Sequence, residues 1–544
     1  MTLDECSRST TGGKWWQNTV FYEVVVASFQ DSNGDGIGDF GGLTSRLDYL
    51  QDLGVTGLWI TPYYPSPRVD NGYDVADHID VDPDFGDLAD FDRFIEQAHS
   101  RNIKVLIDVV LNHVSTEHRW FQQAVSDPQS EYRDYFFFQD LPNGWESFFG
   151  GSAWTLEPNG GQYYYHKFAP QQADLNWQNK AVMDDMTGVL KFWLDRGVDG
   201  FRFDVINFLS CDGIGDENPV GPDGKQIHSK DIDQHGIYSC VSKICDFARR
   251  YSALLGSECF LVGEVGHEEL AKLAPFQSCD LLDVVFNFNL GSIAHFDIVN
   301  IHNQLVAMED RLSGFPTLFF NSHDMPRSIS RLCHDDVAQA AALAALMLTA
   351  RGVCFLYYGE EIGMPDFLPR SIDDMRDVKA TNHFKLALAA GKPVHHAHEI
   401  AIAESRDKSR LYMQWNDDEY SGFSTAPPWI GRTAPSDQPK VSDQINAPDS
   451  LWHWYRKLIA LRQVDQALSL GDYGNLLLDD KLLSISRRWR THITHILINF
   501  STTKRRIRRN DSHDVLADRG LASSEPEWLA PFGVLITRQT LDVG

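Results

Sequence analysis

Residues 104–113, KVLIDVVLNH, form an apolar, β-branched run that ends in two polar residues, Asn112 and His113. The same arrangement recurs at VDGFRFDVI (198–206), CFLVGEV (259–265) and TLFFNSHDMPR (317–327). Near-continuous apolar strands are typical of parallel sheets buried on both faces, and α/β barrels collect catalytic side chains at the carboxyl ends of such strands. The four stretches therefore predict one active site at one end of a parallel barrel.

Strand and helix signals alternate from residue 20 to about residue 360. Besides the four stretches above, strands are expected at VFYEVVVASF (20–29), VTGLWITP (55–62), LLDVVFNFN (281–289) and VCFLYYGEE (353–361). Helical patterns between them include 43–54, 88–102 and 179–197, the last of which stops at a glycine, as helices commonly do. Eight strands with intervening helices predict a closed (β/α)8 TIM barrel of the α/β class.

Two further regions do not follow the alternation of strands and helices that predicts the barrel. Residues 114–174 show no clean helical period and are rich in aromatic residues and glycine, so a small inserted domain is expected after strand 3. Alternating runs such as HITHILINF near the carboxyl end predict a C-terminal antiparallel β domain. The predicted division is a catalytic barrel at 14–113 and 175–464, with an irregular subdomain at about 364–449, an inserted domain at 114–174 and a β domain at 465–544.

The composition limits the class of partner. The formal charge of −28 argues against nucleic acid and anionic membranes, whose phosphates need basic surfaces. The basic run KRRIRR (504–509) is interpreted as a solvated strand edge. No apolar stretch is long enough to span a bilayer, the first residues lack a secretory signal, and the eight cysteines include no CxxC pair. We expect free thiols and a cytoplasmic enzyme, monomeric or weakly homo-oligomeric, that acts on a small oligosaccharide or disaccharide.

Three carboxylates at the predicted strand ends suit glycosidic bond cleavage. That reaction needs one carboxylate as nucleophile or base and one protonated carboxyl to release the leaving oxygen. Asp204 lies two residues after Arg202, so both side chains share a strand face and the cation favours the ionised nucleophile. Glu264 ends an apolar strand, where desolvation raises its pKa and favours the acid. Asp324 is suited to stabilise the positive charge that develops on the sugar ring.

These motifs resemble the four ordered signature regions of the α-amylase family of glycoside hydrolases. The resemblance covers essentially the whole chain from Trp15 onward. It implies a retaining reaction in which Asp204 is the nucleophile, Glu264 the general acid/base and Asp324 the transition-state stabiliser. It also implies substrate-binding roles, which fall on Arg202, His113 and His323.

Two more segments resemble the oligo-1,6-glucosidase and α-glucosidase branch of that family. QADLNW (172–177) is similar to the branch's QPDLNW, with alanine replacing proline, and SRDKSRLYMQW (405–415) is similar to its SRDNSRTPMQW. The resemblance implies that Asp70 and Arg406 close the end of a one-ended pocket, with Tyr73 as the stacking ring. Such a pocket makes an exo-acting enzyme. Phe168, just before QADLNW, is a further candidate for contact with the sugar.

The sequence leaves the exact reaction open. Val205, directly after the nucleophile, resembles members that prefer α-1,6 linkages, whereas alanine or threonine there resembles α-1,4-preferring members. A glucosyltransferase or isomerase of the sucrose or trehalose type would use the same covalent intermediate with a sugar as acceptor. A catalytically inactive binding relative is the third alternative, although this chain retains all three carboxylates.

A glycine-rich acidic loop follows the first predicted strand. GIGDFG (36–41) satisfies the GxGxxG spacing, but three nearby aspartates would repel a pyrophosphate. Alternating oxygen donors suit Ca²⁺ instead, without the bidentate Glu of an EF-hand. The resemblance likewise implies a structural Ca²⁺ site, and an unmetallated acidic turn is the alternative. The predicted ligands are Asp31, Asn33, Asp35, the Ile37 carbonyl and Asp39.

Overall fold

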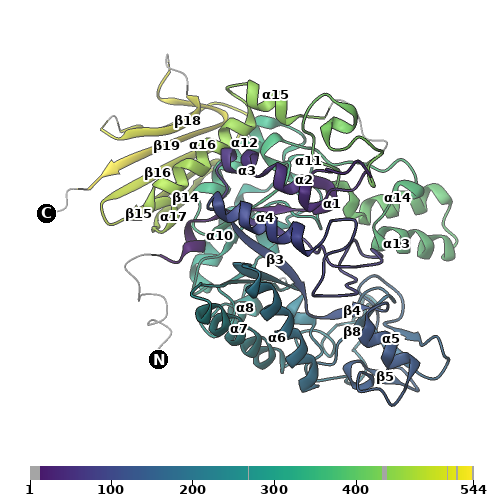
Figure 1. The fold of residues 1–544 in the computed structure, drawn as a ribbon. Helices are drawn as coiled ribbons and strands as arrows, with labels where there is room; N and C mark the ends of the chain where they lie inside the picture. The colour runs from purple at the N-terminus through teal and green to yellow at the C-terminus, as the bar shows by residue number, and fades with distance from the viewer. Residues whose placement is uncertain (1–12, 268, 432–437, 511, 522–524, 542–544) are drawn as a thin grey trace.

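The computed structural model describes residues 13–541 except 268, 432–437, 511 and 522–524 (Figure 1). Residues 1–12, where the sequence predicts no secretory signal and where Cys6 stands, lie outside this part. No helix in the described part combines the length and apolar character needed to cross a bilayer.

The predicted parallel barrel is confirmed, with a strand in each of the eight expected stretches. The strands follow the order β11-β10-β9-β3-β2-β1-β13-β12 and all pair in parallel. They are β1 (Val20–Val24), β2 (Gly57–Ile60), β3 (Lys104–Val110), β9 (Gly200–Asp204), β10 (Phe260–Glu264), β11 (Val284–Phe286), β12 (Thr317–Leu318) and β13 (Val353–Tyr357).

The barrel is nearly closed, and a side chain spans the remaining seam between β11 and β12. The Thr317 hydroxyl donates to Val285 O at 3.0 Å and accepts from Asn287 N at 3.0 Å. The ladder is interrupted there because β12 has only two residues. Thr317 thus supplies the cross-strand hydrogen bonds that a longer strand would make through its backbone.

The first strand is shorter than the sequence predicts. β1 ends at Val24, and Val26–Phe29 form a helical turn, α1. The Phe29 ring is buried edge-on against Trp415, with ring centroids 5.2 Å apart. The apolar run therefore continues past the barrel because it covers the segment after β13.

Aromatic rings fill the barrel interior. Phe21 stacks between Phe260 and Phe355, with centroid distances of 5.2 and 4.9 Å. Trp16, on the short helix η1 (Trp15–Asn18), stacks on Phe260 at the amino end of the strands. Polar chemistry is therefore confined to the opposite, carboxyl end of the strands.

Helices surround the strands where the periodic patterns predict them. Asp87 caps α4 with a capping box and Asn179 caps α6, while the pattern at 43–54 is split at Arg46 into α2 and α3. The main barrel helices are α2 (Phe40–Ser45), α3 (Leu47–Leu53), α4 (Leu88–Ser100), α6 (Lys180–Asp195), α7 (Ile237–Leu254), α10 (Ile298–Arg311), α11 (Ser328–Cys333), α12 (Val337–Thr349) and α16 (Leu451–Val464).

The insertion after β3 projects from the barrel at the lower right of Figure 1. Its base is the antiparallel pair of β4 (His113–Ser115) and β8 (Gln172–Asp174), in which His113 faces Asp174. Between them lie α5 (Arg119–Ser126) and a three-stranded sheet of β5 (Phe138–Gln139), β6 (Trp154–Leu156) and β7 (Tyr163–Tyr165). The sequence showed no clean helical period here, because α5 has only eight residues.

The segment at 364–449 is more ordered than predicted. It contains α13 (Val378–Ala389) and α14 (Val394–Glu404), which pack side by side (Figure 1). Their small shared core includes Ala380 and Ala401. Alanine at the contact gives a weak hydrophobic pattern, which is why the sequence does not reveal these helices clearly.

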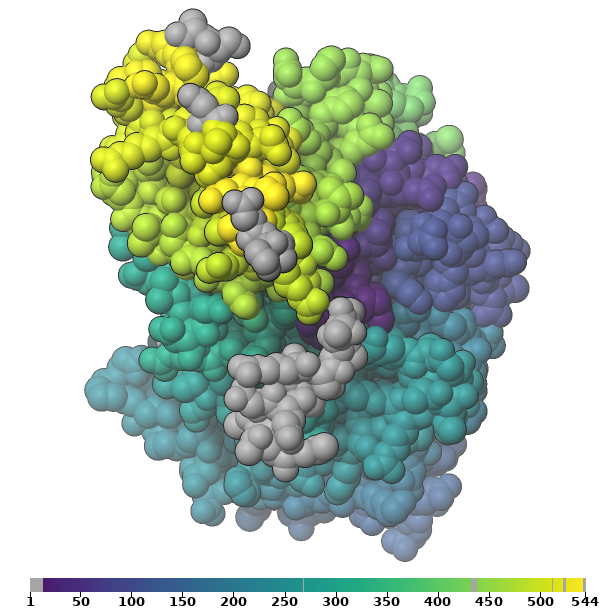
Figure 2. All heavy atoms as spheres, turned by 90° about the vertical axis from the view of Figure 1, so that its left-hand side faces the viewer, coloured from purple at the N-terminus to yellow at the C-terminus, as the bar shows by residue number. Residues whose placement is uncertain are grey.

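An antiparallel sheet follows α16 and α17 (Gln466–Ser469), as predicted, and forms the lobe coloured yellow in Figure 2. Asp465 links this sheet to the barrel: it caps α17 and accepts from Thr494 and Arg538. Its strands are β14 (Asp472–Asp479), β15 (Leu482–Trp489), β16 (His492–Asn499), β17 (Arg505–Arg506), β18 (Asp514–Leu521) and β19 (Trp528–Thr540). In the run 504–509, Lys504, Arg505 and Arg506 form surface ion pairs with acidic side chains.

Candidate active site

The four signature stretches meet around one cavity of about 340 Å³ at the carboxyl ends of the barrel strands. The last residues of β9 and β10, Asp204 and Glu264, and Asp324 in the loop after β12 contribute to its wall. The inserted domain and the segment after β13 cover its sides. The cavity is lined by Asp70, Tyr73, His113, Phe148, Phe149, Phe168, Asp204, Val205, Glu264, Asp324, Pro326, Lys379, Ala403, Glu404, Ser405, Arg406 and Lys408.

One buried guanidinium organises the floor of this cavity. Arg202 Nη1 lies 2.8 Å from Asp108 Oδ1 and 2.6 Å from Asp204 Oδ1, and Nη2 contacts Glu264. Arg202 and Asp204 share a face of β9 because their side chains are two residues apart, and Asp108 is the residue paired with Arg202 on β3. The Arg202 side chain is only 2% exposed, so its charge is balanced by these carboxylates rather than by water.

The two carboxyls on Arg202 share one electrostatic environment. Burial raises the pKa of both Asp204 and Glu264, and the charge of Arg202 opposes the rise in each. Two neighbouring buried carboxyls more readily hold one proton between them than none. The pair can therefore share one proton, so that one carboxyl is ionised and the other protonated, which is what a nucleophile and a general acid require.

Asp324 is ionised by a different set of neighbours. Burial alone would raise the pKa of Asp324, but His323, Arg406 and Arg410 outweigh it and hold that pKa well below its usual range. Arg410 Nη2 lies 3.0 Å and Arg406 Nη1 3.5 Å from Asp324 Oδ1. Asp324 thus offers a fixed negative charge to the cavity.

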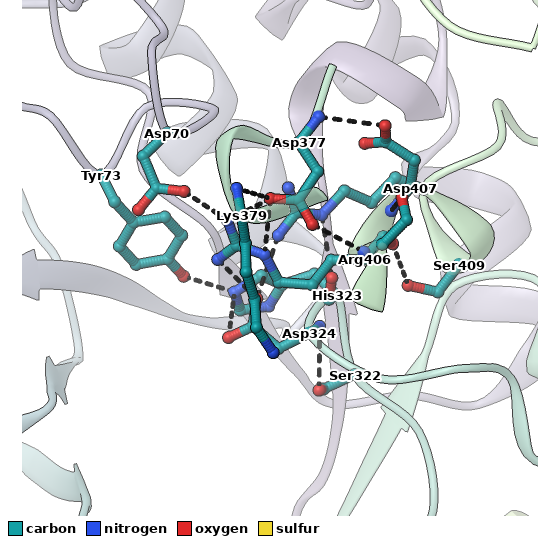
Figure 3. Close-up of polar contacts among 12 residues, drawn as sticks. Asp70, Tyr73, Ser322, His323, Asp324, Asp377, Lys379, Arg406, Asp407 and Ser409 are labelled. Carbon is teal, nitrogen blue, oxygen red and sulfur yellow. Dashed lines mark hydrogen bonds and ion pairs between the residues drawn. The ribbon is translucent and has the colours of Figure 1, made fainter. Parts of the chain in front are cut away.

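His323 carries a positive charge beside Asp324. Burial would lower its pKa, but the carboxylates of Asp324 and Glu23 raise it to about 9. Nδ1 donates to Glu23 Oε1 at 2.5 Å, and Nε2 lies 2.7 Å from the Tyr73 hydroxyl (Figure 3). The Tyr73 hydroxyl in turn donates to Asp108 at 2.9 Å, so one hydrogen-bond chain runs from Glu23 to the Arg202 cluster.

The far end of the cavity is closed by an ion network that Figure 3 shows. Arg406 Nη2 lies 2.5 Å from Asp70 Oδ1 and 2.6 Å from Asp377 Oδ1. Gln172 Nε2 donates to the other Asp70 oxygen at 3.1 Å. We call Asp70, Gln172, Asp377 and Arg406 the gate network. The structure thereby brings together Asp70 and Arg406, which are 336 residues apart in the chain.

His113 lies beside this network and is neutral. Burial lowers the pKa of His113 to about 4. Asn112 Nδ2 donates to Nδ1 at 3.2 Å, which leaves the Nε2 hydrogen for the Tyr73 carbonyl at 3.1 Å. The ring of Phe168 lies 5.4 Å from that of His113 and lines the cavity. Of the predicted sugar contacts, Arg202 and His323 do not line the cavity and are buried beneath its carboxylates.

Val205 has an unusual backbone, with φ 36° and ψ 47°. The left-handed region is rare for a β-branched residue and costs on the order of 1–3 kcal/mol. The turn carries the chain from β9 into the short helix η3 (Ile206–Phe208) and places the Val205 side chain in the cavity wall beside Asp204.

The acidic loop at 31–39 lies away from the catalytic cavity and is held by its own hydrogen bonds. Asp31 accepts from the backbone amides of Asn33, Gly34 and Gly36, and Asp39 accepts from those of Ser32 and Gly42. Asp35 and Asn33 accept from Ile37 N and Asp35 N. The possible metal ligands of this loop are all oxygen atoms, which Ca²⁺ prefers. In the part of the chain that the structure describes, however, no group of three or more His, Cys, Asp or Glu side chains is positioned to hold a metal ion. This arrangement does not by itself form a metal cage.

Several site residues were missed by the sequence analysis. Asp108 stood in a quoted stretch, and Glu23 is a charge inside the apolar strand β1, which is a signal of a buried ion pair. Gln172 and Arg410 also stood in quoted stretches, QADLNW and SRDKSRLYMQW, whereas Asp377 carries no such signal, because only the folded segment brings it beside Arg406.

Comparison with known proteins shows the family to which the chain belongs. The family model for the catalytic domain of α-amylase matches residues 23–471 of this chain. The chain belongs to the α-amylase family. It is 36% identical over 524 residues to the trehalose-6-phosphate hydrolase of Escherichia coli K12, covering 90% of this chain and 91% of that protein. It is also 36% identical to an oligo-1,6-glucosidase of Parageobacillus thermoglucosidasius, with 86% of each chain covered.

Solved structures of this family have the same fold. A trehalose-6-phosphate hydrolase of Bacillus licheniformis superposes with a TM-score of 0.85 at 32% identity, covering 97% of this chain and 100% of that one. An isomaltulose synthase of Klebsiella sp. LX3 superposes with a TM-score of 0.87 at 30% identity, covering 97% and 99%. Family members that resemble this chain therefore differ in reaction, and specificity has to be argued from this chain's own residues.

Replacing His323 with Gln tests the charge assignment. A histidine whose folded pKa is raised adds stability that is complete below its unfolded pKa of about 6.5 and is lost as the pH rises through about 9. The difference in melting temperature between wild type and His323→Gln should therefore be large at about pH 6 and shrink above about pH 9. A difference independent of pH across that range would show that His323 is neutral in the fold.

Proposed function

We propose that the protein is an exo-acting, retaining α-glucosidase that releases glucose from the non-reducing end of short α-glucosides. The observation that carries this proposal is a single cavity in which Asp204, Glu264 and Asp324 lie beside the gate network, whose Arg406 is 3.5 Å from Asp324. A cavity closed beyond its first sugar position admits a chain end and no chain interior. The α-1,6 linkage is slightly favoured, on the evidence of Val205.

The reaction follows from the charges at the cavity floor. The ionised carboxylate of Asp204 attacks the anomeric carbon while Glu264 gives its proton to the leaving oxygen, which forms a covalent glucosyl-enzyme. Glu264 then takes a proton from water as the water oxygen attacks the same carbon, and Asp204 leaves. Two inversions give net retention. The spacing of about 5–5.5 Å that this needs is compatible with two carboxyls held by one guanidinium.

Asp324 and the gate network fix the sugar for this attack. The charge of Asp324 opposes the positive charge that develops on the ring in the transition state. Asp70 and Arg406 can hold the terminal 4-hydroxyl by accepting and donating one hydrogen bond, as an acid–base pair at a closed pocket end does. His113 and Arg202 stay in place through their own hydrogen bonds, so little ordering remains to be done when the sugar binds.

Replacement of Asp204 by Asn is the direct test of the mechanism. The variant should lose at least about 10⁴-fold in kcat, since no covalent intermediate can form. Its circular dichroism and melting temperature should stay near those of wild type, because an amide of the same shape still accepts from Arg202. Turnover within tenfold of wild type would contradict the assignment of Asp204.

A transferase or isomerase is the second candidate, because the isomaltulose synthase named above has the same fold and a sugar can replace water as acceptor. Chromatography of the products from isomaltose, maltose and sucrose distinguishes the two. The α-glucosidase proposal expects free glucose as the main product, a higher kcat/KM for isomaltose than for maltose, and a shift toward maltose in Val205→Thr. Transfer products in excess of glucose at low substrate concentration would favour the second candidate.

A phosphorylated disaccharide should be assayed beside isomaltose, maltose and sucrose. Lys379 and Lys408 line the cavity, but Glu404 pairs with Lys379 at 2.8 Å and neutralises part of that charge. We therefore expect trehalose 6-phosphate, the substrate named for the Escherichia coli relative, to be hydrolysed more slowly than isomaltose.

We also propose that the protein is a monomer or weak homo-oligomer that works in the cytoplasm. This compartment keeps thiols such as those of Cys245 and Cys354 reduced.

We further propose that the loop at 31–39 binds a structural Ca²⁺ when the ion is supplied, with its aspartates turning toward the metal. Addition of Ca²⁺ after treatment with EGTA should then raise the melting temperature, and Asp35→Ala should remove this response while leaving kcat unchanged. Identical melting temperatures with and without Ca²⁺ would show that the loop is stabilised by its Asp31 and Asp39 hydrogen bonds alone.

A further inference from the structure

A fully buried ion pair joins the inserted domain to the long loop between β9 and α7. Lys167, between β7 and β8, and Asp231, in that loop, have side chains that are 0% exposed, and Lys167 Nζ lies 2.5 Å from Asp231 Oδ2. Lys167 Nζ also donates to the Glu146 carbonyl at 3.3 Å, and His228 Nδ1 lies 2.9 Å from the same Asp231 oxygen. We call the pair of Lys167 and Asp231 the latch.

The two residues of the latch carry opposite charges in the folded protein. Burial alone would raise the pKa of Asp231, but the hydrogen bond from His228 and the charge of Lys167 outweigh it and hold that pKa below its usual range. Burial lowers the pKa of Lys167, and the charge of Asp231 opposes the fall. Two apolar side chains of similar volume often stabilise a fold as well as such a pair does, so the latch is better explained by the position that it imposes on the two segments.

The latch lies beside one wall of the catalytic cavity. Lys167 directly precedes Phe168, and Asp231 directly precedes Ile232. Both of the following residues belong to one apolar cluster. Its buried members are Phe149, Phe168, Ala169 and Phe208, with Val205, Ile232 and Val378 packed against them, and Phe149, Phe168 and Val205 also line the catalytic cavity. The latch therefore fastens a wall of the cavity that takes the substrate.

The same loop is connected to both catalytic turns. Asp233 N, two residues after the latch, donates to Asn207 O at 2.8 Å. The buried Asn207 side chain donates through Nδ2 to Gly266 O at 3.4 Å and accepts through Oδ1 from Gly266 N at 3.2 Å. Asn207 and Gly266 follow Asp204 and Glu264 by three and two residues. A shift of the loop at the latch would therefore reach the turn after β9.

This wall reaches the side of the cavity that takes the leaving sugar. The gate network closes the cavity beyond the first sugar, so a second sugar has to lie on the open side. Phe148 marks that side, because it lines the cavity and is 52% exposed. Its ring packs on Phe208 of the apolar cluster in a T-shaped arrangement, with centroids 5.7 Å apart. The cluster beside the latch thus extends to the position of the second sugar.

We propose that the latch is a positioning device for the second sugar: by fixing the wall that includes Val205, Lys167 and Asp231 set the preference between a 6-linked and a 4-linked leaving sugar. This inference rests on the proposed α-glucosidase function. Neither residue of the latch lines the catalytic cavity, so both act through the wall. Loss of the latch loosens the wall and shifts the preference in the same direction as Val205→Thr.

The test replaces the charged pair with an apolar one, Lys167→Met/Asp231→Leu, so that neither charge is left buried without its partner. The ratio of kcat/KM for isomaltose to that for maltose should fall by at least about fivefold, because the wall discriminates between the linkages by its position. The kcat for p-nitrophenyl α-glucoside should stay within about twofold of wild type, because its leaving group is not a second sugar. Adding Val205→Thr should then change the ratio little, since both changes act on the same wall.

The matched control removes an ion pair that stays inside the inserted domain. Arg133 and Glu157 lie 2.9 Å apart with side chains 14% and 7% exposed, and Arg133→Met/Glu157→Leu should leave the ratio unchanged. If the apolar pair does not fold, Asp231→Asn takes its place, because its amide oxygen can still accept from Lys167, and it should lower the ratio at least about twofold. An unchanged ratio in a folded latch variant, or an equal loss on all three substrates, would overturn the proposal. Failure of the α-glucosidase function itself would look different, since wild type would then release no glucose from either disaccharide.

Discussion

The buried guanidinium of Arg202, in contact with Asp108, Asp204 and Glu264, is the interaction on which the rest of the site depends. Without it, three carboxylates would lie together in a nearly water-free volume, a costly arrangement that protonation would relieve. The positive charge of Arg202 allows one carboxyl of the cluster to stay ionised as a nucleophile. Burial favours a proton on the other carboxyl, which can then act as the acid. The register of β3, β9 and β10 sets these positions, since Asp108 pairs with Arg202 on the adjacent strand.

A second layer of charges extends this cluster to the closed end of the cavity. Glu23, His323 and Tyr73 form a hydrogen-bond chain that ends on Asp108, and His323 also contacts Asp324. Asp324 is shared with Arg406, so the catalytic floor and the gate network are parts of one charge system. Positive and negative groups alternate along it, so each ionised group has a partner of opposite charge that helps to hold it in place.

Much of this fold could be predicted from the sequence, because apolar runs that end in polar residues mark both the strands and the end at which the site forms. Alternation along β9 placed Arg202 beside Asp204, and the apolar strand before Glu264 indicated its desolvation. The pairing of Asp70 with Arg406 came from the family resemblance, since no local pattern links residues so far apart. Glu23 and Asp377 were missed because their roles depend on His323 and Arg406, which only the folded chain brings beside them. The helices α13 and α14 were missed because alanine contacts give little periodic signal.

With Asp204 as the nucleophile and Glu264 as the acid on the opposite side of the scissile bond, the reaction must proceed with retention at the anomeric carbon. The most direct measurement is proton NMR of the first glucose released from an α-glucoside, recorded before mutarotation. For a retaining reaction the α-anomer appears first. Initial release of the β-anomer would mean that water attacks directly, and it would contradict the covalent intermediate on Asp204.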